Sequence, residues 1–378
     1  MAVHKIPAHE ALAQWPNPSS PASLATASPS STSSAHGPST GPLAIDARSP
    51  GEYALDHLPF ATNWPVLDDA QRQQVGTIYK QVNPFEANKL GAAMVSENIA
   101  KHLRHHVQNL DRNWKPFVYC WRGGQRSGAL AHVLGQIGFS VRLIEGGYKA
   151  FREAMLQDLA RLAPGLQMVL IHGATGCGKT RLLQHLKALG AQVLDLEGLA
   201  CHRSSVLGHV PGQAQPSQKH FDMLLWQNLR SLDPTRPVFV EAESKRVGAV
   251  TIHPSVFEAM QRADVVNLEA PLAARVNLLC EDYRHFIDDL PSFAARLAAL
   301  RPIVGARVHE QWLASCEQGQ WSTMVEDLLV RHYDPNYIKA GDRLYPKSSS
   351  GHGVKLIDLS EVTLRQCAEQ LIQSSKKA

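Results

Sequence analysis

The segment Gly-Ala-Thr-Gly-Cys-Gly-Lys-Thr at residues 173–180 constrains the fold more than any other part of the chain. It follows an apolar run at residues 168–172 and opens a helical pattern at residues 179–189. The pattern G-x-x-x-x-G-K-[ST] between a strand and a helix is typical of a phosphate-binding P-loop. We therefore expect a P-loop NTPase-like α/β domain with a parallel sheet around this segment.

The residue types of this loop suit the binding of a phosphate or diphosphate. Backbone N–H groups near its glycines can surround the anion, the lysine can neutralise its charge, and the threonine hydroxyl can bind Mg²⁺. We expect no tightly bound cofactor and assign no certain metal site, with Mg²⁺ through Thr180 as the open option. The predicted binding residues are Gly173, Thr175, Gly176, Cys177, Gly178, Lys179 and Thr180.

Two acidic segments could supply a metal ligand or a base to this site. Asp195 and Glu197 follow the run expected as the next strand, and Glu241 and Glu243 follow the run at residues 237–240. Glu241 is placed like the acid at the end of a Walker B strand, and we favour it. The alternative is that it only forms an ion pair with a basic residue at position 245 or 246.

Apolar runs that alternate with helical patterns predict two α/β domains, at residues 43–160 and 161–378. In the N-terminal segment, residues 1–42, the Pro- and Ser-rich stretch 16–42 offers little apolar surface, so we expect this segment to be largely disordered and order to begin at Leu43. A helical C-terminal part is expected at about residues 272–331. Strands are expected at 43–46, 117–120, 141–144, 168–172, 192–196, 238–241, 265–268 and 354–359, with helices at 84–106, 127–137 and 148–162.

A cysteine loop lies in the first of these domains. Cys120 ends an apolar run and is followed by Trp-Arg-Gly-Gly-Gln-Arg-Ser and a helical pattern. In parallel sheets ligands bind at the carboxyl ends of the strands, and a helix N-terminus there can hold an anion. Arg122 and Arg126 add positive charge, which favours a thiolate at Cys120. The sequence therefore predicts a nucleophilic cysteine in an anion-binding loop, whereas the other five cysteines are dispersed and show no metal-site spacing.

Residues 46–53, Asp-Ala-Arg-Ser-Pro-Gly-Glu-Tyr, and residues 57–65 resemble the opening of rhodanese domains. Glu145-Gly-Gly-Tyr148 resembles the stretch after their fourth strand, so the resemblance covers about residues 43–150. It implies that Cys120 carries a persulfide or its selenium equivalent, or attacks a chalcogen donor, with Arg48 and Arg126 as supporting charges. The C-x5-R spacing from Cys120 is one residue longer than in ordinary sulfurtransferases and suits a tetrahedral anion such as selenophosphate.

The cysteine loop and the P-loop, together with residues 201–208 and His332-Tyr-Asp-Pro335, resemble the tRNA 2-selenouridine synthase family over nearly everything after residue 42. The resemblance implies a transferase that acts on wobble 2-thiouridine in tRNA. In that reaction geranyl diphosphate first alkylates the sulfur, and selenophosphate then delivers selenium while geranylthiol leaves. We expect the P-loop to bind geranyl diphosphate and Cys120 to act in selenium transfer.

Two other classes of function remain open: a sulfurtransferase fused to an ATPase or kinase, and a rhodanese-like module that regulates the P-loop domain without catalysis. The net charge of +4 is compatible with a tRNA partner but does not establish one. No apolar run is long enough to cross a membrane, so we expect a cytoplasmic protein. Candidate RNA-contacting residues are scattered: Arg275, Arg284, Arg296, Arg301, Arg307, Lys339, Arg343 and Lys347, with residues 331–337 at the same surface or at the P-loop site.

Overall fold

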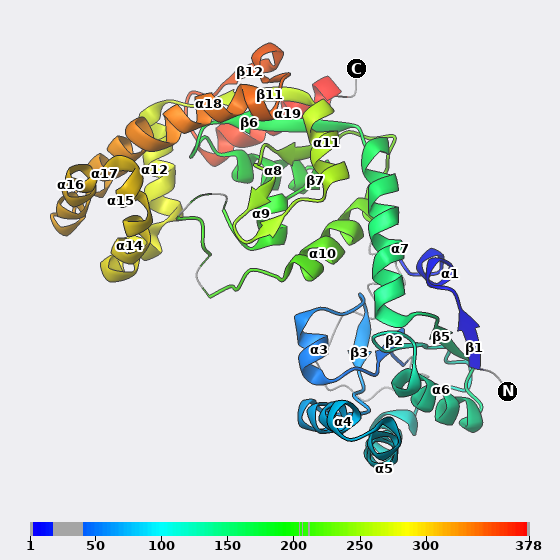
Figure 1. Cartoon of the computed structure of the whole chain (residues 1–378). Coiled ribbons are helices and arrows are strands. Elements are labelled where there is room, and N and C mark those ends of the chain that lie inside the picture. Colours follow the sequence, from blue (N-terminus) through cyan, green and yellow to red (C-terminus); the bar gives the residue numbers. More distant parts are fainter. Residues whose placement is uncertain (1–2, 18–40, 204, 206, 211, 376–378) are drawn as a thin grey trace. The chain divides into compact units, whose positions relative to one another are not determined.

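The computed structural model describes residues 3–17, 41–203, 205, 207–210 and 212–375, without the side chains of 338–342. The chain forms two compact units. The first comprises Met1–Leu159 with Asp222–Ser231, and the second comprises Ala160–Phe221 with Leu232–Ala378. Each contains a five-stranded sheet whose strands are all parallel, with helices on its faces (Figure 1). The predicted α/β class, with a helical C-terminal part, is confirmed.

The sheet of the first unit has the strand order β1-β5-β4-β2-β3. Its strands are β1 (Val3–Ile6), β2 (Ala44–Asp46), β3 (Ala61–Asn63), β4 (Phe117–Tyr119) and β5 (Val141–Ile144). Its helices are α1 (Ala8–Ala13), α3 (Pro50–Leu55), α4 (Asp69–Gln81), α5 (Pro84–His102), α6 (Gln125–Ile137) and α7 (Gly147–Leu162), with a π-helical turn at Leu103–Val107.

Side chains of the central strand β4 alternate between the two faces of this sheet, as the pleat requires. Val118 belongs to the buried cluster that includes Leu130 and Leu134 of α6. Phe117 instead packs against Trp15, with ring centroids 5.0 Å apart, and Trp15 also contacts Phe151 of α7 at 4.8 Å. Helices therefore cover both faces of the sheet at β4, which explains why this central strand is apolar throughout.

The expectation that order begins at Leu43 is wrong. Residues Val3–Ile6 form the edge strand β1, which pairs in parallel with β5 from Val3 opposite Val141 to Ile6 opposite Ile144. The short helix α1 then buries Ala11 and Leu12, and Trp15 is 2% exposed. These few apolar residues suffice because an existing sheet edge supplies the hydrogen-bond partners. Of the stretch predicted to be disordered, residues 18–40 lie outside the described part of the chain.

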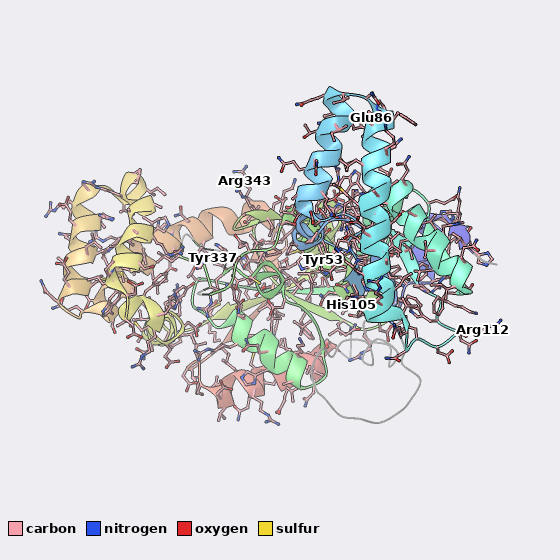
Figure 2. The ribbon with its side chains drawn as sticks, turned by 90° about the horizontal axis from the view of Figure 1, so that it is seen from below. Tyr53, Glu86, His105, Arg112, Tyr337 and Arg343 are labelled. Carbon is pink, nitrogen blue, oxygen red and sulfur yellow. The ribbon has the colours of Figure 1, made fainter. Side chains whose placement is uncertain are left out.

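Helices α4 and α5 form a pair beside this sheet, and only α5 was predicted. Asp68 caps α4 by accepting the N–H of Gln71 at 2.7 Å, and Asn83 caps α5 by accepting that of Glu86 at 2.9 Å. None of the residues of α4 is buried, so the apolar period that identifies a helix in sequence is weak there. Figure 2 labels Glu86 near the start of α5 and His105 in the π-helical turn that follows it.

The second sheet has the strand order β12-β11-β6-β8-β7, with β6 (Met168–Gly173) at its centre. Its other strands are β7 (Gln192–Leu194), β8 (Val238–Glu241), β11 (Asp264–Glu269) and β12 (His352–Lys355). Helices α8 (Lys179–Ala188) and α19 (Glu361–Ser375) bury a common leucine-rich cluster with this sheet. The remaining elements of this unit are α9 (Leu196–Ala200), α11 (Pro254–Arg262) and a hairpin of β9 (Arg246–Val247) and β10 (Val250–Thr251). Helix α10 (Gln218–Ser231) begins in this unit, but its residues Asp222–Ser231 belong to the first.

Two predicted strands of this unit end earlier than expected. The strand expected at 192–196 stops at Leu194 because Asp195 caps α9 and accepts the N–H of Gly198 at 2.7 Å. The strand expected at 354–359 spans His352–Lys355, and Asp358 instead accepts the N–H of Ser360 at 2.9 Å. In both places a short polar side chain bonds to the backbone two or three residues ahead, which favours a turn or cap over a strand.

The predicted helical part, residues 272–331, is confirmed as a group of short helices with a core of its own. They lie together on one side of the second unit (Figure 1). Their bounds are α12 (Leu272–Asp282), α13 (Arg284–Ile287), α14 (Leu290–Leu297), α15 (Arg301–Val304), α16 (Ala306–Glu317) and α17 (Trp321–Leu328), followed by a π-helical turn at Leu329–Tyr333 and α18 (Asp334–Leu344).

Among the described residues, none of the helices combines the length and the apolar character that a membrane span requires.

Candidate functional site

Cys120 lies directly after β4, at the start of the loop that leads into α6. The residue is 3% exposed, and the hydroxyl of Ser127 donates a hydrogen bond to its Sγ at 3.1 Å. Ser127 belongs to the first turn of α6, whose N-cap is Gly124. The thiol therefore sits beside a helix N-terminus, where unpaired N–H groups favour negative charge. Ser127 is a neighbour of the thiol that the sequence analysis had not singled out.

The glycines of this loop and of the segment after β5 are required by a close approach between the two. Gly123 and Gly147 both have positive φ, of 65° and 58°. A Cβ atom added at Gly147 would lie 2.2 Å from the carbonyl oxygen of Cys120. The N–H of Tyr148 donates to that oxygen at 2.8 Å. The Glu-Gly-Gly-Tyr motif thus holds the cysteine loop in place by backbone contact, which no larger side chain would allow.

Arg48, predicted as a supporting charge, is buried at 2% exposure and engaged elsewhere. Its guanidinium forms a 2.6 Å ion pair with Asp46, donates to the backbone oxygen of Asp56 and lies 4.2 Å from the ring centroid of Tyr148. Burial alone would lower the pKa of Arg48, but the Asp46 carboxylate outweighs it and raises that pKa. The observed partners of Arg48 are therefore those of a cation that holds the end of β2 to the surrounding loops.

The other two predicted arginines differ in their partners. Arg126 forms a two-point ion pair with Glu52, at 2.5 and 3.3 Å. Burial alone would raise the pKa of Glu52, but the hydrogen bonds and charge of Arg126 lower it. Arg122 is exposed, and no described residue forms an ion pair with it. Of the three arginines, Arg122 is the one whose charge is free to meet an anion at the cysteine loop.

The P-loop has the geometry that its sequence predicts. It runs from the end of β6 to α8, and Gly176 and Gly178 have φ of 78° and 85°. At Gly173, an added Cβ atom would lie 2.5 Å from the Sγ of Cys177 and 2.8 Å from the backbone oxygen of Leu268. The loop thus needs glycine at these positions, and Cys177, 1% exposed, fills the space beneath it.

Lys179 begins α8 and reaches back across the loop. Its Nζ donates to the backbone oxygen of Gly173 at 2.9 Å. Burial alone would lower the pKa of Lys179, but Cys177 and the carboxylates of Glu243, Glu197 and Glu241 outweigh it and raise that pKa. The lysine therefore stays charged and can exchange its bond to the loop for one to a phosphate oxygen.

Three residues beside the lysine form a short relay of hydrogen bonds. The hydroxyl of Thr180 donates to the Oε2 of Glu197 at 3.2 Å, and the N–H of Glu197 donates to the Oε1 of Glu241 at 2.8 Å. Glu241 is fully buried, and its Oε2 has no partner among the described residues. Burial, together with the neighbouring Glu197, Glu243 and Asp195, raises the pKa of Glu241 well above its ordinary range.

The sequence favoured Glu241 as the acid of this site, but Glu197 and Glu243 are the glutamates that line the cavity. Asp195 caps α9, while Glu197, two residues further, lines the P-loop cavity together with Glu243. Glu241 supports Glu197 from below and does not itself line that cavity. The parallel strands β7 and β8 bring these acids together because both end at the same edge of the sheet as the P-loop.

The cavity above the P-loop has a volume of about 400 Å³. Besides the P-loop residues, the lining includes the polar side chains of His172, Tyr337 and Tyr345. The Nδ1 of His172 lies 2.9 Å from the Oδ1 of Asn267 and 2.7 Å from the hydroxyl of Tyr337. The hydroxyl of Tyr345 donates to the backbone oxygen of Glu243. Residues 331–337, which sequence placed either here or on an RNA surface, thus contribute Tyr337 to the cavity wall.

Arg275, listed by sequence among scattered RNA-contacting cations, is a buried part of this site. Its Nε donates to the backbone oxygen of Thr175 at 2.9 Å, and its two terminal nitrogens bond Asp334 at 2.6 and 3.1 Å. The His-Tyr-Asp-Pro motif therefore fixes the P-loop through a paired arginine, a geometry that lysine could not reproduce. The side chain of Lys339 lies outside the described residues, and Arg284, Arg301, Arg307, Arg343 and Lys347 are exposed.

Each of the two loops lies in a segment that matches a known protein family. Residues 34–154, with Cys120, match the family model of the rhodanese-like domain, and residues 166–297, with the P-loop, match that of the tRNA 2-selenouridine synthase AAA domain. Among similar proteins, the tRNA 2-selenouridine synthase of Nitrosomonas europaea is 37% identical over 63% of each chain. That of Shewanella pealeana is 31% identical over 78% of this chain and 87% of its own length, and that of Aeromonas salmonicida 31% over 78% and 86%. Both resemblances that the motifs indicated are confirmed.

Proposed function

Because the chain belongs to the tRNA 2-selenouridine synthase family, we propose that it converts wobble 2-thiouridine in tRNA to 2-selenouridine through a geranylated intermediate. The observation that carries the proposal is the pair of anion-binding loops, each inside a segment that matches its family model. A two-step transfer needs two such loops, one for a diphosphate and one for a chalcogen donor. We place the reaction in the cytoplasm, where tRNA is found.

In the first step, geranyl diphosphate binds with its diphosphate in the loop at residues 173–180. The sulfur of 2-thiouridine attacks the first carbon of the geranyl group, a carbon–sulfur bond forms, and diphosphate leaves with the electron pair of the broken carbon–oxygen bond. Lys179 faces the leaving group and stabilises its growing charge. The alkylated sulfur then departs as a thiol, which is a better leaving group than bare sulfide.

A Mg²⁺ ion fits the oxygen-rich corner of this site. The Thr180 hydroxyl and the Glu197 carboxylate are 3.2 Å apart and belong to the ligand class that Mg²⁺ prefers. When bound, the ion would supply positive charge for the diphosphate oxygens. The described residues contain no group of three or more His, Cys, Asp and Glu side chains that could hold a metal.

In the second step, Cys120 takes part in selenium transfer from selenophosphate. The selenium of selenophosphate forms a bond to the carbon of the base that carried the sulfur, the carbon–sulfur bond breaks, and geranylthiolate leaves with the electron pair and takes up a proton. Water then attacks the phosphorus atom, the phosphorus–selenium bond breaks, and phosphate leaves. The N-terminus of α6 and the free charge of Arg122 are the groups placed to hold the phosphate part of the donor. Ser127, which donates a hydrogen bond to the Sγ of Cys120, fixes the position of the sulfur beside this helix N-terminus.

The test uses purified full-length chain, 2-thiouridine tRNA, geranyl diphosphate, Mg²⁺ and selenophosphate, with digested nucleosides read by mass spectrometry. The wild type should form geranylated and then selenium-containing uridine. Cys120→Ala should stop after geranylation, and Lys179→Ala should lose geranylation by about a hundredfold or more while it still selenates tRNA supplied in geranylated form. Thiosulfate sulfurtransfer or ATP turnover without any modified nucleoside would contradict the proposal and favour a sulfurtransferase fused to an ATPase or kinase.

A further inference from the structure

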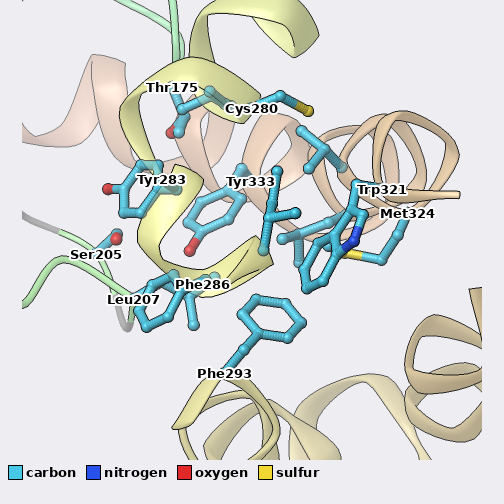
Figure 3. Close-up of a pocket in the computed structure, with 14 residues that line it drawn as sticks. Thr175, Ser205, Leu207, Cys280, Tyr283, Phe286, Phe293, Trp321, Met324 and Tyr333 are labelled. Carbon is cyan, nitrogen blue, oxygen red and sulfur yellow. The ribbon is translucent and has the colours of Figure 1, made fainter. Parts of the chain in front are cut away.

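A second, apolar cavity of about 50 Å³ lies in the helical part of the second unit. Most of its lining comes from α12, α13, α14, α17 and the π-helical turn that follows α17, and Thr175, Ser205 and Leu207 complete it (Figure 3). Among the described residues that line it, no side chain is charged. Phe286, Phe293, Met324 and Leu328 are between 2% and 4% exposed, whereas most of the other lining residues are partly exposed. A mainly apolar lining of this kind next to a binding site favours an apolar occupant.

This cavity and the P-loop cavity share one wall. Five residues line both: Thr175, Ser205, Leu279, Tyr283 and Tyr333. Ser205, Tyr283 and Tyr333 each bring a hydroxyl group to this shared wall. In Figure 3 these hydroxyl groups lie on one side of the cavity, and Trp321 and Met324 lie on the other. We call this shared wall the neck. A ligand chain that extends past the neck leaves its hydroxyl groups and meets the apolar side chains of the second cavity.

A ladder of aromatic rings runs from the neck into the cavity. Tyr283 stacks on Phe286 with centroids 6.0 Å apart, Phe286 meets Phe293 at 5.5 Å, and Phe293 meets Trp321 edge-on at 5.2 Å. Rings in such contact form a continuous apolar track that suits a hydrocarbon with flat double-bonded segments. A nucleotide base would not suit it, because its polar edge would find no hydrogen-bond partners there.

We infer that this cavity holds the hydrocarbon chain of a prenyl diphosphate whose diphosphate lies at residues 173–180, and that Trp321 and Met324 at its far end limit the chain length. The inference rests on the proposed function and adds to it a second subsite. By a measure in which one water needs about 10–15 Å³, the cavity of about 50 Å³ accepts a few carbon-sized groups. The first carbons of the chain lie in the shared neck, and the flexible Met324 side chain can move to admit the last ones.

The first measurement is the affinity of the full-length wild-type chain, by calorimetry in Mg²⁺, for inorganic diphosphate and for dimethylallyl, geranyl and farnesyl diphosphates. Geranyl diphosphate should bind about tenfold or more tightly than dimethylallyl diphosphate, since five more carbons leave water. Farnesyl diphosphate should gain nothing further, because Trp321 blocks the longer chain.

The second measurement uses variants at the far end of the cavity. Trp321→Ala should tighten the binding of farnesyl relative to geranyl diphosphate by about tenfold, and Met324→Phe should weaken geranyl but not dimethylallyl diphosphate by a similar factor. Neither change should alter the affinity for inorganic diphosphate. Trp312→Phe is the matched control, since Trp312 lies in the same helical core but does not line the cavity. Thermal unfolding of each variant confirms that it is folded before binding is measured.

Two failures can be told apart. If no prenyl diphosphate binds more tightly than inorganic diphosphate, whereas a nucleoside triphosphate does, the P-loop does not serve the proposed reaction and this inference falls with it. If geranyl diphosphate binds tightly but Trp321→Ala and Met324→Phe leave the order of chain lengths unchanged, the proposed function stands and the apolar cavity is not its subsite.

Discussion

The cysteine loop and the P-loop both follow a parallel strand and lead into a helix, yet they distribute charge in opposite ways. At the cysteine loop, two of the three predicted arginines are paired with carboxylates of their own unit, Arg48 with Asp46 and Arg126 with Glu52. At the P-loop, Lys179 lies among the carboxylates of Glu243, Glu197 and Glu241, while the other cations that line the cavity, Arg181 and Arg203, are paired with Asp282. Among the described residues, the cysteine loop thus keeps the unpaired charge of Arg122, whereas carboxylates are in excess around Lys179.

This difference indicates how each loop meets an anion. The cysteine loop can rely on backbone N–H groups and one exposed arginine, because its other cations are part of the scaffold. A diphosphate beside Glu197 and Glu243 would be repelled by their carboxylates unless an additional cation is bound. The Mg²⁺ that we propose at Thr180 would supply that positive charge. The same strand–loop–helix geometry therefore does not imply the same balance of charges.

The largest effect that tests this comparison is the loss of stability that we expect when Arg48 is replaced. Arg48→Ala leaves the buried carboxylate of Asp46 without its partner and should lower the free energy of unfolding by about 3–5 kcal/mol. Arg122→Ala, at an exposed position, should leave stability within about 0.5 kcal/mol of the wild type and weaken selenophosphate binding. Denaturant unfolding and selenation of pre-geranylated tRNA measure the two effects. Equal loss of stability in both variants would remove the distinction between scaffold and ligand-binding arginines.

A smaller expected effect is a difference between the two units in how their stability depends on pH. The lowered pKa of Glu52 stabilises the first unit above the ordinary carboxyl value of 4.5, and this contribution is lost as the pH falls through the folded pKa below it. The raised pKa of Glu241 acts with the opposite sign. The folded second unit holds a proton that the unfolded chain has released, so its stability falls as the pH rises from 4.5 toward the folded pKa.

Hydrogen exchange of peptides from each unit, measured without Mg²⁺ over a pH series and corrected for the intrinsic rate, checks these signs. Glu241→Gln should remove the loss of protection of the second unit with rising pH, because the amide cannot ionise yet keeps an oxygen for the N–H of Glu197. Glu52→Gln should remove the acid-side loss in the first unit only. A change of both units in either variant would show that the effect is not local.

The sequence predicted those parts of the fold and site that depend on local pattern. Strands β4, β6 and β8 were visible as apolar runs, and the glycines of both loops were visible as motifs. Edge strand β1 was missed because four residues give too little pattern, and α4 because none of its residues is buried. Side-chain partners were the least predictable part. Nothing near Arg275 in sequence distinguishes a buried structural cation from a ligand-binding one, since its partner Asp334 lies 59 positions away.

The acids of the P-loop site allow the finest test of the comparison, because two of them are close in sequence and differ in position. Asp195 caps α9, so Asp195→Ala should cost about 1 kcal/mol of stability and leave geranylation unchanged. Glu197→Gln keeps the shape of the side chain and its backbone bond to Glu241 but removes the charge beside Thr180. It should therefore lower geranylation and raise the Mg²⁺ concentration needed for half-maximal rate, with stability nearly unchanged. Titration of Mg²⁺ at fixed geranyl diphosphate measures this shift. If Asp195→Ala shifted the Mg²⁺ requirement and Glu197→Gln did not, the acid that serves the diphosphate would be the helix cap, and the excess of negative charge that we assign to the P-loop side would have to be located elsewhere.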